Sequence, residues 1–79
     1  MYALTVPRNP LRFRLIAEAA RRCLLGSPYR ALRWISCDCN HGVLLLRGRL
    51  SSFYHKQLAQ EAVAGVEGVT QVINEIEVG

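Results

Sequence analysis

The sequence lacks any long apolar stretch. Hydrophobic residues make up 51% of its 79 residues, yet no apolar run approaches the roughly 20 residues that a membrane-spanning helix needs. The apolar share is nevertheless too high for a disordered chain. Two separate cores would each fall below the size that usually folds alone. We therefore expect one small domain, from which a deep catalytic cleft is hard to build.

Cysteine is also scarce, with only Cys23, Cys37 and Cys39 in the chain. An odd number and a Cys-x-Cys spacing do not make a disulfide framework. Free, reduced thiols favour the cytoplasm, with a peripheral membrane association left open. Arginines at positions 8, 12 and 14 interrupt the apolar core that a secretion signal would need. We therefore expect a cytoplasmic protein without a leader.

Acidic residues are few in the first part of the chain. Residues 1–49 hold nine arginines against Glu18 and Asp38, which gives +7, whereas residues 50–79 sum to −3. Arginine binds phosphate or carboxylate groups through two parallel hydrogen bonds. Two interpretations stay open at this point: an anionic partner, or neutralisation between the two halves of the chain.

The first half predicts an arm, a helix and a hairpin. Residues 1–9 show no clear period and form the arm. Asn9 as N-cap and Pro10 as first helical residue begin a helix that Gly26 ends. Its apolar face is expected to consist of Leu11, Leu15, Ile16, Ala19, Ala20, Cys23 and Leu24. On the opposite face of this helix, Glu18 can pair with Arg22 four residues later. Residues 31–40 and 43–50 alternate as two strands of a hairpin around the turn at 40–42.

The second half predicts a helix and one more strand. Ser51 or Ser52 caps the helix, which runs to about Val66 with Phe53 in its apolar stripe, and residues 69–78 alternate as a strand. The order is αββαβ. The two helices must cover one face of a three-stranded mixed sheet, in a two-layer α+β sandwich. The strands that enclose the second helix are expected to run parallel.

Two segments carry a resemblance to a known family. Residues 42–50 read GVLLLRGRL and residues 66–78 read VEGVTQVINEIEV. From about Trp34 onward the chain resembles a single BON domain, the bacterial osmotic-shock and nodulation module. The first helix agrees with the family in type and position, so we expect the domain to span residues 10–79. The resemblance implies an αββαβ fold and a role in phospholipid attachment or protein interaction, without catalytic residues. Cys37 and Cys39 depart from the β-branched residues or threonine usual there.

Metal binding and catalysis are the alternatives to a binding role. Cys37, Cys39 and His41 are spaced to share one face of a strand, and thiolate with imidazole suits zinc. A structural zinc site needs a fourth ligand, which Cys23 or His55 would have to supply. No cysteine–histidine pair is specified for nucleophilic catalysis. We therefore expect no metal, no cofactor and no enzymatic activity.

Two surfaces are candidates for binding a partner. The uncovered sheet face would bind protein, although the same side chains could simply pack across the strands. The polar, solvent-facing side of the first helix would bind anionic lipid. Nucleic acid is the third candidate partner, because the sequence lacks the paired stacking aromatic residues of an RNA-binding sheet. The alternative is a self-associating cytoplasmic adaptor with no lipid role. The sheet-face residues are Trp34, Val43, Leu45, Arg47, Arg49, Ile73 and Glu75, and the helix residues are Arg12, Arg14, Arg21 and Arg22.

Overall fold

Residues 10–79 are described by a computed structural model, and they begin with helix α1 (Pro10–Leu25). The predicted start at Pro10 is confirmed, while the arm and the Asn9 cap lie outside the described residues. The helix ends where predicted, and the Gly26 N–H donates to the Arg22 carbonyl at 2.9 Å. Glycine suits this exit because it continues the chain without a side chain beside the last turn.

A short helix replaces the beginning of the first predicted strand. The prediction of a strand from residue 31 is wrong, because Arg30–Trp34 forms the 3-10 helix η2 with Leu32 buried against the core. The strand β1 (Ser36–Asn40) follows. It pairs antiparallel with β2 (Val43–Arg47). Gly42, at φ +82°, closes the turn, and a Cβ there would lie 2.9 Å from the Thr70 Oγ1.

The second half of the chain is a crossover between parallel strands. The strand β3 (Arg49–Leu50) leads to Ser52, whose side chain accepts a hydrogen bond from the His55 N–H and caps helix α2. From β2 to β3 each residue pairs with the one 28 positions later. The Glu77 N–H donates to the Gly48 carbonyl at 2.9 Å, so the pairing continues across the gaps between the short strands. The remaining elements are α2 (Phe53–Ala64), β4 (Gln71–Asn74) and β5 (Glu77–Val78).

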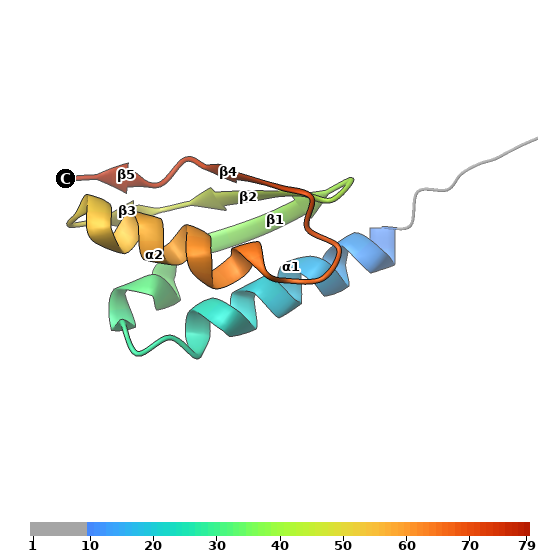
Figure 1. The fold of residues 1–79 in the computed structure, drawn as a ribbon, viewed down its shortest axis with the longest axis horizontal. Coiled ribbons are helices and arrows are strands. Elements are labelled where there is room, and N and C mark those ends of the chain that lie inside the picture. Colours follow the sequence, from blue (N-terminus) through green and yellow to red (C-terminus); the bar gives the residue numbers. More distant parts are fainter. Residues whose placement is uncertain (1–9) are drawn as a thin grey trace, which may run out of the picture.

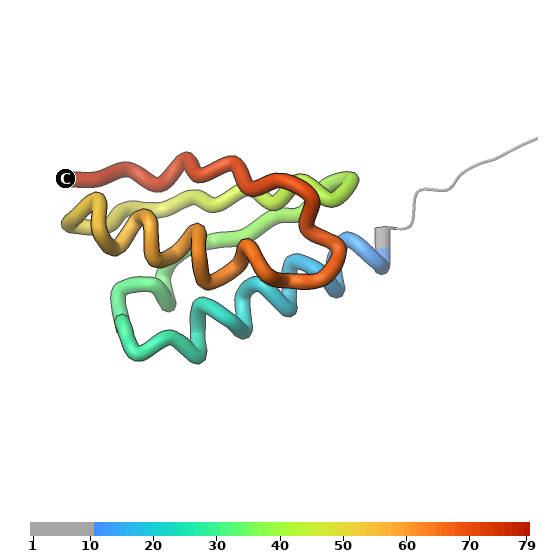
Figure 2. Tube along the Cα trace, in the orientation of Figure 1, coloured from blue at the N-terminus to red at the C-terminus, as the bar shows by residue number. Residues whose placement is uncertain are grey.

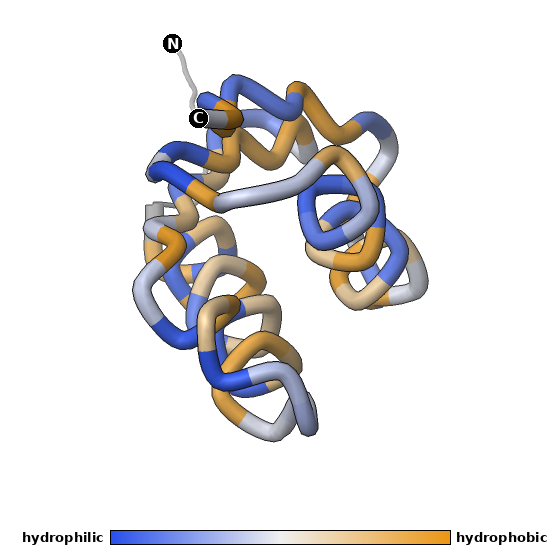
Figure 3. Tube along the Cα trace, turned by 90° about the vertical axis from the view of Figure 1, so that its left-hand side faces the viewer, coloured by the Kyte–Doolittle hydropathy of each residue, from blue (hydrophilic) through white to orange (hydrophobic). Residues whose placement is uncertain are grey.

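The two helices lie on the same side of the sheet (Figures 1 and 3). The sheet order is β1-β2-β4, with α1 against β1 and α2 against β4, so the predicted α+β order and mixed sheet are confirmed. Apolar residues from both layers meet between them, as expected for a two-layer domain. The buried set comprises Ile16, Ala20, Leu24, Leu32, Ile35, Leu44, Leu46, Leu50, Ala59, Val63 and Ile76.

Four residues that were expected in the apolar stripes are exposed instead: Leu11, Leu15, Cys23 and Phe53. Cys23 lines the groove between α1 and α2 and is not enclosed in the core. Leu11 and Leu15 are 59% and 54% exposed, because α1 rests on the sheet through Ile16 and the residues one and two turns later. Phe53 is also exposed, since it is the first residue of α2 and lies beyond the core. These apolar groups are therefore available at the surface.

The molecule has two distinct ends (Figure 2). At one end lie the start of α1, the hairpin turn and the loop between α2 and β4. At the other end lie η2, the start of α2 and β5. The β4 strand and its continuation β5 are joined through Asn74. Its amide donates to the Lys56 carbonyl at 3.0 Å and its oxygen accepts from the Ile76 N–H at 3.2 Å.

Candidate binding surfaces

The uncovered face of the sheet carries a small apolar strip. Val43 and Leu45 are half-buried and Ile73 is 40% exposed, and Leu45 is the direct neighbour of Ile73 across the parallel strands. Trp34 was predicted on this face, but the structure places it in η2, ahead of β1. Within residues 10–79, no helix covers this side of the sheet.

Two ion pairs flank this apolar strip. The Arg47 Nε lies 3.2 Å from the Glu75 Oε1, and an Arg49 guanidinium nitrogen lies 3.1 Å from the Glu77 Oε1. All four side chains are exposed, so each pair contributes little to stability. Their electrostatic effect is clearer, because the positive charges on this face are matched locally by carboxylates. The sheet face is therefore a poor surface for an anion.

The outer face of α1 combines leucines with arginines. Leu11, Leu15 and Leu25 project among Arg14, Arg21 and Arg22, and all six side chains are exposed. The predicted pair between Glu18 and Arg22 does not form. Arg14, Arg21 and Arg22 make no ion pair with another described residue. We call these six residues the α1 outer face.

The positive charge of the chain is concentrated around this face. Residues 10–34, which form α1 and η2, hold six arginines against Glu18 and sum to +5, whereas residues 35–79 sum to −2. Arg12 belongs to this basic set and lies beside a hollow of about 270 Å³ that Phe13 and His41 also line. The two helical elements therefore form a basic side, and the sheet forms a nearly neutral one.

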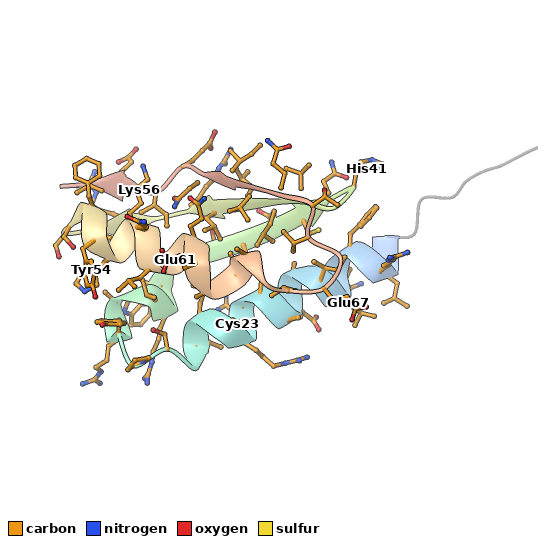
Figure 4. All side chains as sticks on the ribbon, in the orientation of Figure 1. Cys23, His41, Tyr54, Lys56, Glu61 and Glu67 are labelled. Carbon is orange, nitrogen blue, oxygen red and sulfur yellow. The ribbon has the colours of Figure 1, made fainter. Side chains whose placement is uncertain are left out.

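Aromatic side chains gather at one end of the molecule. The ring of Tyr29 lies 6.3 Å from that of Tyr54 and 5.4 Å from that of His55, both in edge-to-face geometry. The two tyrosine hydroxyls are 3.5 Å apart. Figure 4 shows Tyr54 at this end, with His41 at the opposite end. This cluster is not predictable from helical or strand periodicity, because periodicity does not report contacts between a loop and the start of a helix.

The thiols do not form a chemical site with histidine. His41 has φ +54° in the turn, and its ring lies 5.2 Å from that of Phe13. Cys37 and Cys39 are half-buried against the helices, and burial raises the pKa of Cys37 to about 11. Among residues 10–79, no three histidine, cysteine or acidic side chains gather where they could hold a metal ion.

An open, mainly apolar groove lies between the helices. It has a volume of about 540 Å³ and lies between the end of α1, η2 and α2. Leu32, Leu58 and Ala62 form its floor, and Arg22 and Glu61 are its charged members. No histidine lines it. The groove therefore has the chemistry of a contact surface and supplies no histidine to act as a base for Cys23, the thiol that lines it.

These features define a small two-layer α+β module whose described residues form apolar, aromatic and charged surfaces. The family model of the BON domain matches residues 14–79. The chain therefore belongs to the BON-domain family, a family of non-catalytic binding modules. No curated protein matches the chain. In the described part of the chain, no helix is both long enough and apolar enough to cross a membrane.

Proposed function

We propose that the protein is a non-catalytic binding module that attaches peripherally to anionic phospholipid membranes. The observation that carries this proposal is the α1 outer face, where Leu11, Leu15 and Leu25 are exposed on the same helix as three arginines that form no ion pair with another described residue. Glu18 is the single carboxylate of α1, so the helix keeps a positive excess. A helix with apolar and basic side chains on its free face lies in the membrane interface, where the apolar groups enter the acyl boundary and the cations meet phosphates.

The excess positive charge lies on one side of the molecule, and this uneven distribution favours binding to a membrane surface over unspecific attraction to anions. On the sheet, Glu75 and Glu77 neutralise Arg47 and Arg49. On the α1–η2 side the sum is +5, which orients the molecule with that side toward a negative surface. Each arginine close to an anionic membrane contributes about 1 kcal/mol of binding free energy. Four or five such contacts would give reversible attachment.

The decisive experiment compares two double variants of equal net charge in vesicle flotation. Arg21→Gln/Arg22→Gln removes two arginines from the α1 outer face, and Arg47→Gln/Arg49→Gln removes two from the sheet. With vesicles containing phosphatidylglycerol, the first should weaken binding by about 30-fold, which corresponds to about 2 kcal/mol. The second should change binding much less. Equal losses would mean that only net charge matters, and absent flotation would refute the lipid role.

The leucines provide a second, independent arm of the same test. Leu15→Ser should weaken flotation without a change in charge, since its side chain is more than half exposed and contributes little to the core. Unfolding by urea should remain within about 0.5 kcal/mol of the parent protein, as is usual for surface positions. Flotation that stays unchanged would indicate binding through charge alone, without entry into the acyl boundary.

Protein association through the uncovered sheet face is the second candidate. It is supported by the exposed Ile73 beside Leu45, because an apolar strip bordered by charged pairs resembles the core and rim of an interface. Leu45→Arg would then abolish association in analytical ultracentrifugation while leaving flotation intact. A parent protein that stays monomeric at high concentration and captures no partner through this face would refute this candidate.

A further inference from the structure

Four exposed aromatic residues lie in or next to η2 and the first turn of α2. These two segments lie at the same end of the molecule (Figure 2), where Figure 4 labels Tyr54. Trp34 is 84% exposed, Phe53 is 74% exposed and Tyr54 is 61% exposed, while Tyr29 is exposed to a smaller extent. We call Tyr29, Trp34, Phe53 and Tyr54 the aromatic end. Single exposed apolar residues are ordinary on a small protein, but four large exposed aromatic side chains at one end indicate an interaction site.

The aromatic end is fixed by its surroundings. Tyr29 is held by Tyr54 and His55 through ring contacts, and its backbone N–H donates to the Ser27 Oγ at 3.1 Å. Phe53 and Tyr54 form the first turn of α2, which Ser52 caps. Trp34 ends η2, next to the buried Ile35. These side chains are therefore presented by ordered backbone.

Two arginines without ion pairs lie between Tyr29 and Trp34 along the chain. Arg30 and Arg33 of η2 are exposed and make no ion pair with a described residue. The carboxylate of Glu77 in the neighbouring strand β5 already binds Arg49. A partner at this end must therefore be anionic and must also accept tryptophan and tyrosine rings. The headgroup layer of an anionic membrane meets both requirements, since amphipathic rings settle at that depth and arginine binds phosphate.

From this combination we infer that the aromatic end enters the headgroup layer of the membrane and fixes the tilt of the bound domain. The inference rests on the proposed attachment to anionic phospholipid and adds the orientation. The loop of residues 26–29 joins the end of α1 to η2, so Leu25 and Arg22 are the residues of the α1 outer face closest to the aromatic end along the chain. The domain then meets the membrane along the edge between the α1 outer face and the aromatic end, with the sheet face turned away.

Trp34 reports on this orientation directly because it is the only tryptophan in the chain. In solution its emission should be that of a water-exposed indole. Vesicles of phosphatidylcholine with phosphatidylglycerol should shift the emission to shorter wavelength and protect it from acrylamide. Vesicles of phosphatidylcholine alone should cause neither change. A second protein, Trp34→Phe/Gln71→Trp, moves the reporter to the sheet face near the opposite end and should show no shift while it still floats.

Affinity provides the second readout. Arg30→Gln/Arg33→Gln should weaken vesicle binding by about 30-fold if both guanidinium groups reach phosphates. Trp34→Ala should weaken it by about tenfold, because a large apolar side chain leaves water on binding. Gln71→Ala, on the far sheet face, should bind like the parent protein.

The outcomes separate the orientation from the attachment itself. Flotation with an unshifted Trp34 would overturn the orientation and leave the lipid role in place, most clearly if the reporter at position 71 shifts instead. Absent flotation would remove both. A spectral shift that appears with rising protein concentration, without vesicles, would show that the aromatic end contacts a second copy or another protein, and would overturn the inference.

Discussion

Asn74 is the residue whose replacement should most clearly test how the two layers are joined. Its amide nitrogen donates to the Lys56 carbonyl at 3.0 Å and to the Gln60 Oε1 at 3.3 Å, both on α2. Its oxygen accepts from the N–H of Ile76, a residue that is only 2% exposed. One half-buried side chain therefore ties the sheet to the helix and satisfies the backbone between β4 and β5.

The cost of Asn74→Ala follows from these bonds. The Ile76 N–H would be left without its side-chain partner, at a cost of about 1–3 kcal/mol, and the loss of the bond to Lys56 would add about 0.5–1.5 kcal/mol. The expected destabilisation is about 2–4 kcal/mol. A domain of this size has a total stability of only about 4–12 kcal/mol. The melting temperature should therefore fall by at least about 10 °C.

Urea unfolding followed by circular dichroism measures this change. Asn74→Asp keeps the acceptor for Ile76 but loses the donor to Lys56, so it should fall between the parent and the alanine variant. Gln71→Ala, an exposed position in the same strand, is the matched control and should stay within about 0.5 kcal/mol of the parent. A loss below about 0.5 kcal/mol for Asn74→Ala would refute the role assigned to this side chain.

Three further predictions concern the turn glycines, the thiols and the helix cap. Gly68→Ala should destabilise the fold by about 2 kcal/mol or more in urea unfolding, because φ is +96° and the new Cβ would lie 2.7 Å from the Ile16 Cδ1. Gly65→Ala is the control: no atom lies within 4 Å of its new Cβ, so it should be neutral or slightly stabilising in the same assay. Alkylation at pH 8, mapped by mass spectrometry, should modify the exposed Cys23 first, since a pKa raised by burial from 9.0 to about 11 lowers the thiolate fraction of Cys37 about a hundredfold. Equal labelling of both thiols would contradict the raised pKa of Cys37. The folded state also holds the Cys37 proton more tightly than the unfolded state does, so the stability that Cys37 contributes should be constant below about pH 9 and should decline between about pH 9 and 11. Ser52→Ala should cost about 0.5–2 kcal/mol and Ser52→Asp much less, since only the aspartate can still accept from the His55 N–H; equal melting temperatures for the two variants would argue against the cap.

The element order was predictable because each signal was local and strong. Alternation predicts that Cys37 and Cys39 share one face of a strand, and the structure places both on the helix side, across the hairpin from Leu46 and Leu44. The Ser52 cap and the exit at Gly26 were likewise found from single residues in their sequence context. These features depend on neighbours along the chain, which a sequence displays directly.

The surfaces were harder to predict because they depend on packing between elements. Helical periodicity placed Leu15 and Ile16 on one broad apolar arc, although they lie about 100° apart around the helix. Only contact with the sheet decides that Ile16 is buried and Leu15 is exposed. Trp34 was assigned to a strand because it continues the alternation of residues 35–39. The burial of Leu32 overrides that local pattern and winds residues 30–34 into η2.

The two ion pairs on the sheet also bear on which strand alignment the chain can adopt. Arg47 with Glu75 and Arg49 with Glu77 share the offset of 28 residues found along the whole parallel pair. A slip of two residues keeps every side chain on its own face, so burial alone discriminates weakly against it. After such a slip only one arginine would still face a carboxylate, and a charged group would lie opposite Leu45 or Ile73. The two ion pairs add little stability, but they can thus exclude the nearest competing alignment of the parallel strands.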